Sequence, residues 1–165
     1  MIGLERNGDV VQMASYAPLF ANTEAWQWTP DLIWVNSLGV NLTPNYYVQK
    51  MFANNPGEAT VPLELSATKG AKLFASATRD NARGELILKV VNASTQAAKV
   101  KLQLAGAKNV AAPISVTTLT GSPNDENSFK TPARIAPVEK TLKKSSSNFE
   151  YSFPADSLTV LRLKI

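Results

Sequence analysis

The sequence predicts a mainly β protein: an antiparallel, jelly-roll-like β-sandwich that follows a short helix–strand–helix segment. Two observations support this fold class. From residue 58 onward, apolar and polar residues alternate with a period of two between closely spaced turn signals, which is typical of a sandwich. Before residue 57, helix signals surround one apolar run, and a breaker cluster at 54–57 (NNPG) separates the two regions. We therefore expect two units, residues 1–57 and 58–165.

The first unit is expected to contain two helices and one strand. Residues 9–20 are predicted to form a helix, because their apolar side chains recur at helical spacing and Asp9 can cap the start. Residues 32–35 (LIWV) are uniformly apolar, which is typical of a strand buried on both faces. Thr43 and Pro44 suit the N-cap and first position of a second helix. The lone strand has no neighbour to pair with, so we expect this unit to belong to a larger parallel α/β structure.

The second unit is expected to consist of short strands. Residues 85–92 are apolar on both faces, so this strand is predicted to be central in its sheet. Residues 125–137 form a polar connection that is too long for a bare hairpin. The predicted strands are 61–67, 73–78, 85–92, 99–104, 114–120, 148–153 and 158–165.

The composition excludes several kinds of chemistry. The chain has neither cysteine nor histidine, so disulfides, a cysteine nucleophile and a serine–histidine pair are impossible within it. Zinc would have to be held by carboxylates alone, and no glycine-rich phosphate loop is present. We therefore expect no metal and no cofactor.

Charge and hydropathy argue against nucleic-acid and membrane partners. The net charge is +4, and the densest basic group, Lys140, Lys143 and Lys144, has no aromatic residues interleaved with it. Such a group is typical of a solvated loop rather than a nucleic-acid patch. No apolar run approaches the roughly 20 residues that span a bilayer, and the start lacks a signal-peptide pattern. Opening directly inside a helix–strand pattern fits an internal boundary of a longer protein, although Met1 also suits a native start.

Five collinear blocks resemble the α-L-arabinofuranosidases of glycoside hydrolase family 51. Residues 5–20 (ERNGDVVQMASYAPLF), 28–37 (WTPDLIWVNS) and 43–52 (TPNYYVQKMF) are similar to the end of that family's catalytic barrel. Residues 119–142 and 157–163 resemble its C-terminal β-sandwich. The resemblance implies that residues 1–57 are the terminal helix–strand–helix of a truncated (β/α)8 barrel. It also implies a parent that removes terminal α-L-arabinofuranosyl residues from arabinan and arabinoxylan by a retaining mechanism.

The resemblance also implies that the catalytic residues lie elsewhere. The family's two catalytic glutamates lie on earlier barrel strands, upstream of the matched blocks. In this chain, none of the eight Glu and five Asp is expected at the carboxyl end of a barrel strand, where such enzymes place catalytic groups. We therefore predict no catalytic residue and no activity for the chain alone, with its sandwich in a structural role.

The expected partners follow from the same comparison. They are the rest of the chain's own catalytic barrel and, through the parent, an arabinose-containing polysaccharide. The barrel face would be exposed in the isolated chain, so either self-association into a homo-oligomer or disorder of this part is also expected. The cellular location is undetermined, and a periplasmic or secreted parent would fit such a substrate.

Three residues are candidates for lining a sugar site. Trp26 and Trp28 lie in a loop that leads into the apolar strand, and aromatic rings dock the apolar faces of sugars. Asn36 follows the same strand at its carboxyl end, where either a turn cap or a substrate contact would fit. Trp34, inside the apolar run, is expected in the core. The alternative function is a carbohydrate-binding module that acts alone and uses this aromatic loop as its platform.

Overall fold

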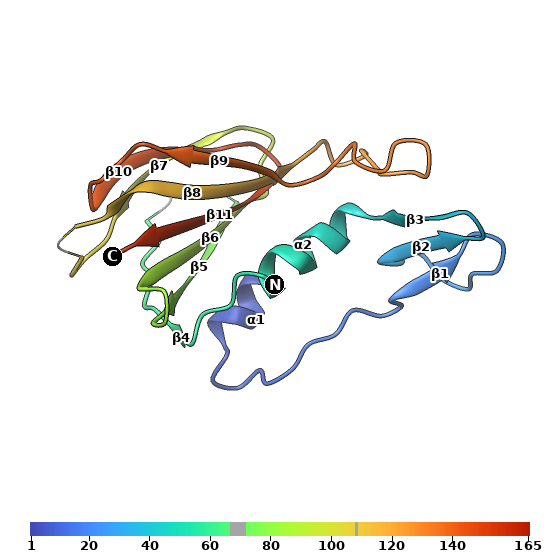
Figure 1. The fold of residues 1–165 in the computed structure, drawn as a ribbon, viewed down its shortest axis with the longest axis horizontal. Helices are drawn as coiled ribbons and strands as arrows, with labels where there is room; N and C mark the ends of the chain where they lie inside the picture. Colours follow the sequence, from blue (N-terminus) through green and yellow to red (C-terminus); the bar gives the residue numbers. More distant parts are fainter. Residues whose placement is uncertain (67–71, 108) are drawn as a thin grey trace.

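Two antiparallel sheets of the computed structural model form the sandwich, and the structure describes residues 1–66, 72–107 and 109–165. The larger sheet has six strands in the order β4-β5-β6-β11-β8-β9, and the smaller one pairs β10 with β7 (Figure 1). The strands are β4 (Ala59–Thr60), β5 (Leu73–Asp80), β6 (Glu85–Asn92), β7 (Ala98–Gln103), β8 (Ala111–Thr120), β9 (Val138–Leu142), β10 (Asn148–Phe153) and β11 (Ser157–Lys164). The predicted mainly β, antiparallel fold class is confirmed.

The main core lies between the two sheets. On β10, every second residue (Phe149, Tyr151 and Phe153) is buried, while the residues between them are exposed. These rings pack with Leu161 and Leu163 of β11, which have no exposed surface. The period-two pattern of the sequence thus corresponds to one solvent-exposed face and one buried face of the smaller sheet.

A second cluster covers the outer face of the larger sheet. Ile87 on β6 and Val160 on β11 point away from the main core and are nearly inaccessible to solvent. They pack with Met51 and Phe52 of helix α2 (Pro44–Ala53) and with Ile2 of helix α1 (Ile2–Arg6). Because β6 is covered on both faces and lies between β5 and β11, its prediction as a central strand is confirmed.

Helix α2 forms where its local signals predict it. The backbone N–H of Tyr46 donates to the Thr43 side-chain oxygen at 3.3 Å, and Pro44 occupies the first turn, where its missing N–H leaves no bond unmade. The helix ends at Ala53, ahead of the predicted breaker cluster.

A small three-stranded sheet lies at the other end of α2 (Figure 1). Strand β1 (Phe20–Asn22) pairs in parallel with β2 (Ile33–Asn36), and β2 pairs antiparallel with β3 (Gly39–Leu42). The prediction that the apolar strand has no neighbours is therefore wrong. Strands β1 and β3 have only three and four residues, which is too short to show a periodic pattern in the sequence. The strand is also only half-buried, rather than buried on both faces.

The predicted helix at residues 9–20 does not form. The helix of this region is α1, which ends before Asn7-Gly8, and the following residues run irregularly as far as β1. Val10 is 74% exposed and Met13 is 87% exposed. A short helix is stabilised mainly by burying an apolar face, and Val10 and Met13 bury little of their surface in the described structure.

Two strand predictions also need correction. No strand forms in the described part of the stretch predicted as strand 61–67, and the strand of this region, β4, ends at Thr60. Val61 and Leu63 still pack against the main core, while Leu65 is exposed. Ala67 lies outside the described residues. Strand β9 was not predicted, because its exposed residues carry little alternation, but it pairs with β8 at the edge of the larger sheet. Among the described residues, no helix has the length and apolar character needed to cross a bilayer.

Candidate functional site

The candidate site is the edge at which β1 and β2 end, here called the carboxyl edge and comprising residues 22–28 and 36–39. Asn22 pairs with Val35 in the parallel register, so the two strands end side by side. In parallel α/β barrels, this is the edge that carries the active site. Trp26 and Trp28 follow the end of β1, and Asn36 is the last residue of β2.

Hydrogen bonds tie the segment after β1 to β2. The Thr23 N–H donates to the Val35 carbonyl at 3.0 Å, and the Asn22 side-chain oxygen accepts from the Glu24 N–H at 2.9 Å. Beyond this turn, the Trp26 ring meets the Trp34 ring edge-on, with centroids 5.8 Å apart. The predicted core residue Trp34 is thus half-buried and supports a candidate residue.

The two candidate tryptophans remain accessible. Trp26 is 51% exposed and Trp28 is 66% exposed. Exposure of two large indole rings is unusual in a packed domain and is typical of a surface that meets a ligand or a partner.

Asn36 caps the turn between β2 and β3. Its side-chain oxygen accepts the N–H groups of Leu38 at 2.9 Å and Gly39 at 2.8 Å. The amide nitrogen has no acceptor among the described residues. The turn fixes the side chain and leaves this donor available, so a substrate-lining role for Asn36 stays a prediction.

A residue of the sandwich holds the same small sheet in place, and it is not among the site residues predicted from the sequence. Asn127, which is 6% exposed, lies in the connection between β8 and β9. Its amide nitrogen donates to the Leu42 carbonyl and to the Ile135 carbonyl, both at 2.8 Å. Asn41 donates in turn to the Asn127 carbonyl at 3.1 Å. The connection is therefore fastened to β3 over a sequence separation that no local pattern reveals.

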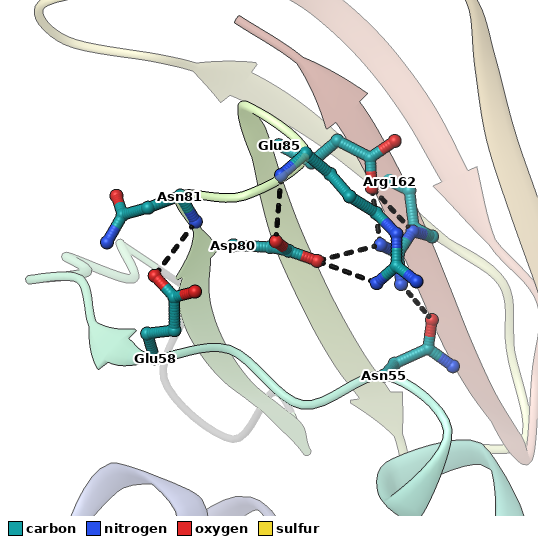
Figure 2. Close-up of polar contacts among 7 residues, drawn as sticks. Asn55, Glu58, Asp80, Asn81, Glu85 and Arg162 are labelled. Atoms are coloured by element: carbon teal, nitrogen blue, oxygen red, sulfur yellow. Dashed lines mark hydrogen bonds and ion pairs between the residues drawn. The ribbon is translucent and has the colours of Figure 1, made fainter.

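Two carboxylates of the sandwich, Asp80 and Glu85, are held by arginines (Figure 2). Arg162 on β11 donates to Glu85 at 2.8 Å, to Asn55 at 3.0 Å and to Asp80 at 3.4 Å. Asp80 also accepts two hydrogen bonds from Arg83, which lower its pKa below the ordinary value, with Arg162 adding a smaller effect. A glycosidase acid needs a raised pKa, so this cluster is suited to joining strands and not to proton donation.

A buried ion pair joins α1 to the larger sheet. Lys89 on β6 has no exposed surface, and it donates to the carboxylate of Glu5, which also accepts from the Ser76 hydroxyl. The Lys89 ammonium lies 5.4 Å from the centroid of the Phe52 ring on α2. Burial lowers the pKa of Lys89, and the contact with Glu5 opposes that shift. One cation thus connects both helices to β6.

An open groove of about 910 Å³ runs between the two helices and the irregular segment after α1. It reaches Leu32 and Ile33 at the beginning of β2, but none of the three candidate residues lines it. In the described part of the chain, no cluster of three acidic side chains could hold a metal ion.

The fold and the carboxyl edge define a class: an antiparallel β-sandwich attached to a small three-stranded sheet that contains one parallel strand pair. A family model described as the α-L-arabinofuranosidase C-terminal domain matches residues 1–157, and the chain belongs to that family. The predicted family is confirmed.

The relatives are larger enzymes. α-L-Arabinofuranosidase 1 of Arabidopsis thaliana is 34% identical over 96% of this chain, and α-L-arabinofuranosidase A of Aspergillus niger is 32% identical over 98%. This chain spans about a quarter of their length, 24% and 25% respectively. The chain thus corresponds to the C-terminal portion of such enzymes, as predicted.

Solved structures agree with the fold. The arabinose-bound MgGH51 α-L-arabinofuranosidase superposes with a TM-score of 0.92 at 35% identity, covering 99% of this chain and 26% of that one. The thermostable family 51 enzyme from Thermotoga petrophila gives a TM-score of 0.82 at 23% identity, over 98% of this chain and 36% of that one, and supports the fold alone.

Proposed function

We propose that this chain is the C-terminal part of an α-L-arabinofuranosidase that removes terminal α-L-arabinofuranosyl residues from arabinan and arabinoxylan. Residues 1–57 complete its catalytic barrel, and residues 58–165 form the supporting sandwich. The family membership and the names of the relatives support this proposal.

The single observation that carries the barrel role is the outer edge of β1. This strand pairs with β2 on one side, and no strand of the described chain pairs with it on the other. Beside that edge, Leu19 and Phe20 are 46% and 60% exposed. An unpaired strand edge with apolar side chains needs a neighbouring strand, which the preceding strand of a closed barrel supplies.

The sandwich holds this part of the barrel through α2 and α1. Arg162 holds the end of α2 by its bond to Asn55, two residues beyond the helix, and Lys89 holds α1 by its ion pair with Glu5. Met51 and Phe52 add an apolar contact with the outer face of the larger sheet. These contacts keep the small sheet in a defined place, which is what support of a catalytic barrel requires.

Activity should depend on the rest of the barrel. We expect the full-length enzyme to hydrolyse an aryl α-L-arabinofuranoside, because it contains the two catalytic glutamates, and the 165-residue chain to show no turnover above a mock purification. Release of the aryl group measures both. Turnover by the short chain, or none by the full-length enzyme, would contradict the proposal.

The carboxyl edge should contribute to arabinose binding. In the full-length enzyme, Trp26→Ala, Trp28→Ala and Asn36→Ala are each expected to raise KM for the aryl substrate, by roughly three- to tenfold if a stacking or hydrogen-bond contact is lost. Phe74→Ala is the matched control, because Phe74 is 53% exposed on β5, away from this edge. Unchanged KM in all three variants would show that the carboxyl edge does not contact the arabinosyl group.

The exposure of Trp26 and Trp28 favours a second candidate function, a carbohydrate-binding module that acts alone. It predicts heat of binding when the 165-residue chain is titrated with arabinan or arabinoxylan, lost on Trp26→Ala or Trp28→Ala. Absence of heat with both polymers would exclude it.

A further inference from the structure

The connection between β8 and β9 extends far from the sandwich. In Figure 1 it is the orange loop that leaves the end of β8, passes along α2 and reaches β3. Asn127 anchors it to β3 through the Leu42 carbonyl and the Asn41 side chain. At the base of the loop, Ile135 is 7% exposed and packs with the cluster that contains α2. The loop is thus fixed at its base and along its length.

A tight turn lies midway along this connection. The Ser128 and Thr131 hydroxyl groups are 2.8 Å apart and share a hydrogen bond, and the Thr131 N–H donates to the Ser128 carbonyl at 3.1 Å. Between them, Phe129 is 37% exposed. The hydrogen bonds hold the backbone, so the ring is presented by a defined turn and not by an open loop.

Phe129 lies at the carboxyl edge. A Cβ atom built on Gly39 would be 3.9 Å from Cδ1 of the Phe129 ring, which is van der Waals contact. Gly39 pairs directly with Asn36 in the β2–β3 register. The sandwich therefore places the Phe129 ring next to β3, one strand away from the candidate residue Asn36 on β2. Strand β1 lies on the other side of β2.

We propose that Phe129 is a further substrate-contacting residue, whose ring stacks on a sugar of the polysaccharide chain that carries the arabinosyl group. This inference rests on the proposed function. Trp26 and Asn36 follow the barrel strands, where the arabinosyl group would be cleaved, whereas Phe129 lies outside them beyond β3. A ring at that position meets the neutral polymer rather than the terminal sugar, and aromatic rings bind the apolar faces of such sugars.

The test compares a short and a long substrate in the full-length enzyme. Phe129→Ala is expected to raise KM for arabinoxylan roughly three- to tenfold, the effect of one lost stacking contact, while KM for an aryl α-L-arabinofuranoside stays unchanged. Phe129→Leu keeps an apolar side chain against Gly39 but removes the flat ring, so it should show the same defect. Phe129→Tyr should restore wild-type KM, and Phe74→Ala should leave both substrates unaffected.

The outcomes separate the two proposals. If the wild-type enzyme fails to hydrolyse the aryl substrate, the proposed function is wrong. If the wild type is active but Phe129→Ala and Phe129→Leu leave KM for arabinoxylan unchanged, Phe129 is not a substrate contact. An equal rise of KM for both substrates would likewise overturn the inference, because it would assign Phe129 to packing of the edge.

Discussion

Lys89 is a buried charge that fixes the position of helix α1. It has no exposed surface and is compensated by Glu5, a residue whose sequence context suggests only a polar turn ahead of a helix. Removing one partner of a buried pair leaves the other charge without compensation. The pair therefore stabilises the position of α1 only while both members are present.

Glu5→Gln should lower the free energy of unfolding of the chain by about 3 kcal/mol, a typical cost of breaking a buried ion pair. The double variant Glu5→Gln with Lys89→Met should recover much of this loss, because it removes the uncompensated ammonium. Urea unfolding measures both. An unchanged midpoint for Glu5→Gln would show that the pair contributes nothing.

Asp80 gives a prediction for acid stability. Arg83 and, to a smaller extent, Arg162 hold its folded-state pKa below the ordinary value of 3.8. Ionised Asp80 therefore stabilises the fold fully above 3.8, and this contribution is lost as the pH falls through the lowered pKa. The melting temperature of the wild type should fall more steeply than that of Asp80→Asn from about pH 4 to about pH 2. An equal fall of the melting temperature with pH in the wild type and in Asp80→Asn would contradict this role.

At the scale of elements, helices and strands could be predicted where local signals determine them, and not where their stability depends on tertiary packing. Helix α2 could be predicted because its N-cap and first-turn proline act within a few residues. The helix expected at 9–20 failed because its stability needed a surface to pack against. Strands β1 and β9 were missed for another reason: the first is three residues long and the second is an exposed edge, so neither shows alternation.

The residues of the candidate site also fall into two groups, those that the sequence predicts and those that only the structure reveals. Trp26, Trp28 and Asn36 could be named because aromatic and amide residues next to an apolar strand are visible in the sequence. Asn127 and Phe129 could not be named, since they reach β3 from the far end of the chain. Long-range contacts of this kind leave no trace in a local pattern.

The N-cap of α2 offers a test at the element scale. The Thr43 hydroxyl accepts from Tyr46 and donates to the Leu32 carbonyl at 2.8 Å, so it joins the helix to β2. Thr43→Ala should reduce the free energy of unfolding by about 1–2 kcal/mol, whereas Thr43→Ser should cost only a few tenths. Thermal or urea unfolding distinguishes the two. Equal stability of both variants would show that the cap is dispensable.

At the scale of the whole molecule, the two edges of the small sheet differ. The β3 edge is covered by the β8–β9 connection, while the β1 edge carries exposed Phe20. An open edge with apolar side chains can pair with a second copy of the chain. The predicted homo-oligomer would form there.

The 165-residue chain should therefore associate as its concentration rises, and Phe20→Lys should shift it toward monomer, because a charge on an edge strand opposes pairing. Phe74→Lys, which places the same charge on β5, should leave association unchanged. Light scattering after gel filtration measures the mass. A monomer at every concentration, or equal effects of both substitutions, would rule out pairing through β1.

The covered β3 edge also constrains how a parent enzyme could reach its native state. Because proteins are synthesised from the N-terminus, the sandwich and its long loop would leave the ribosome after strands β1, β2 and β3. The loop can fasten β3 only once the sandwich has folded, so the final hydrogen bonds around the carboxyl edge would form late. The carboxyl edge of a nascent chain would then reach its final geometry only after the sandwich is complete.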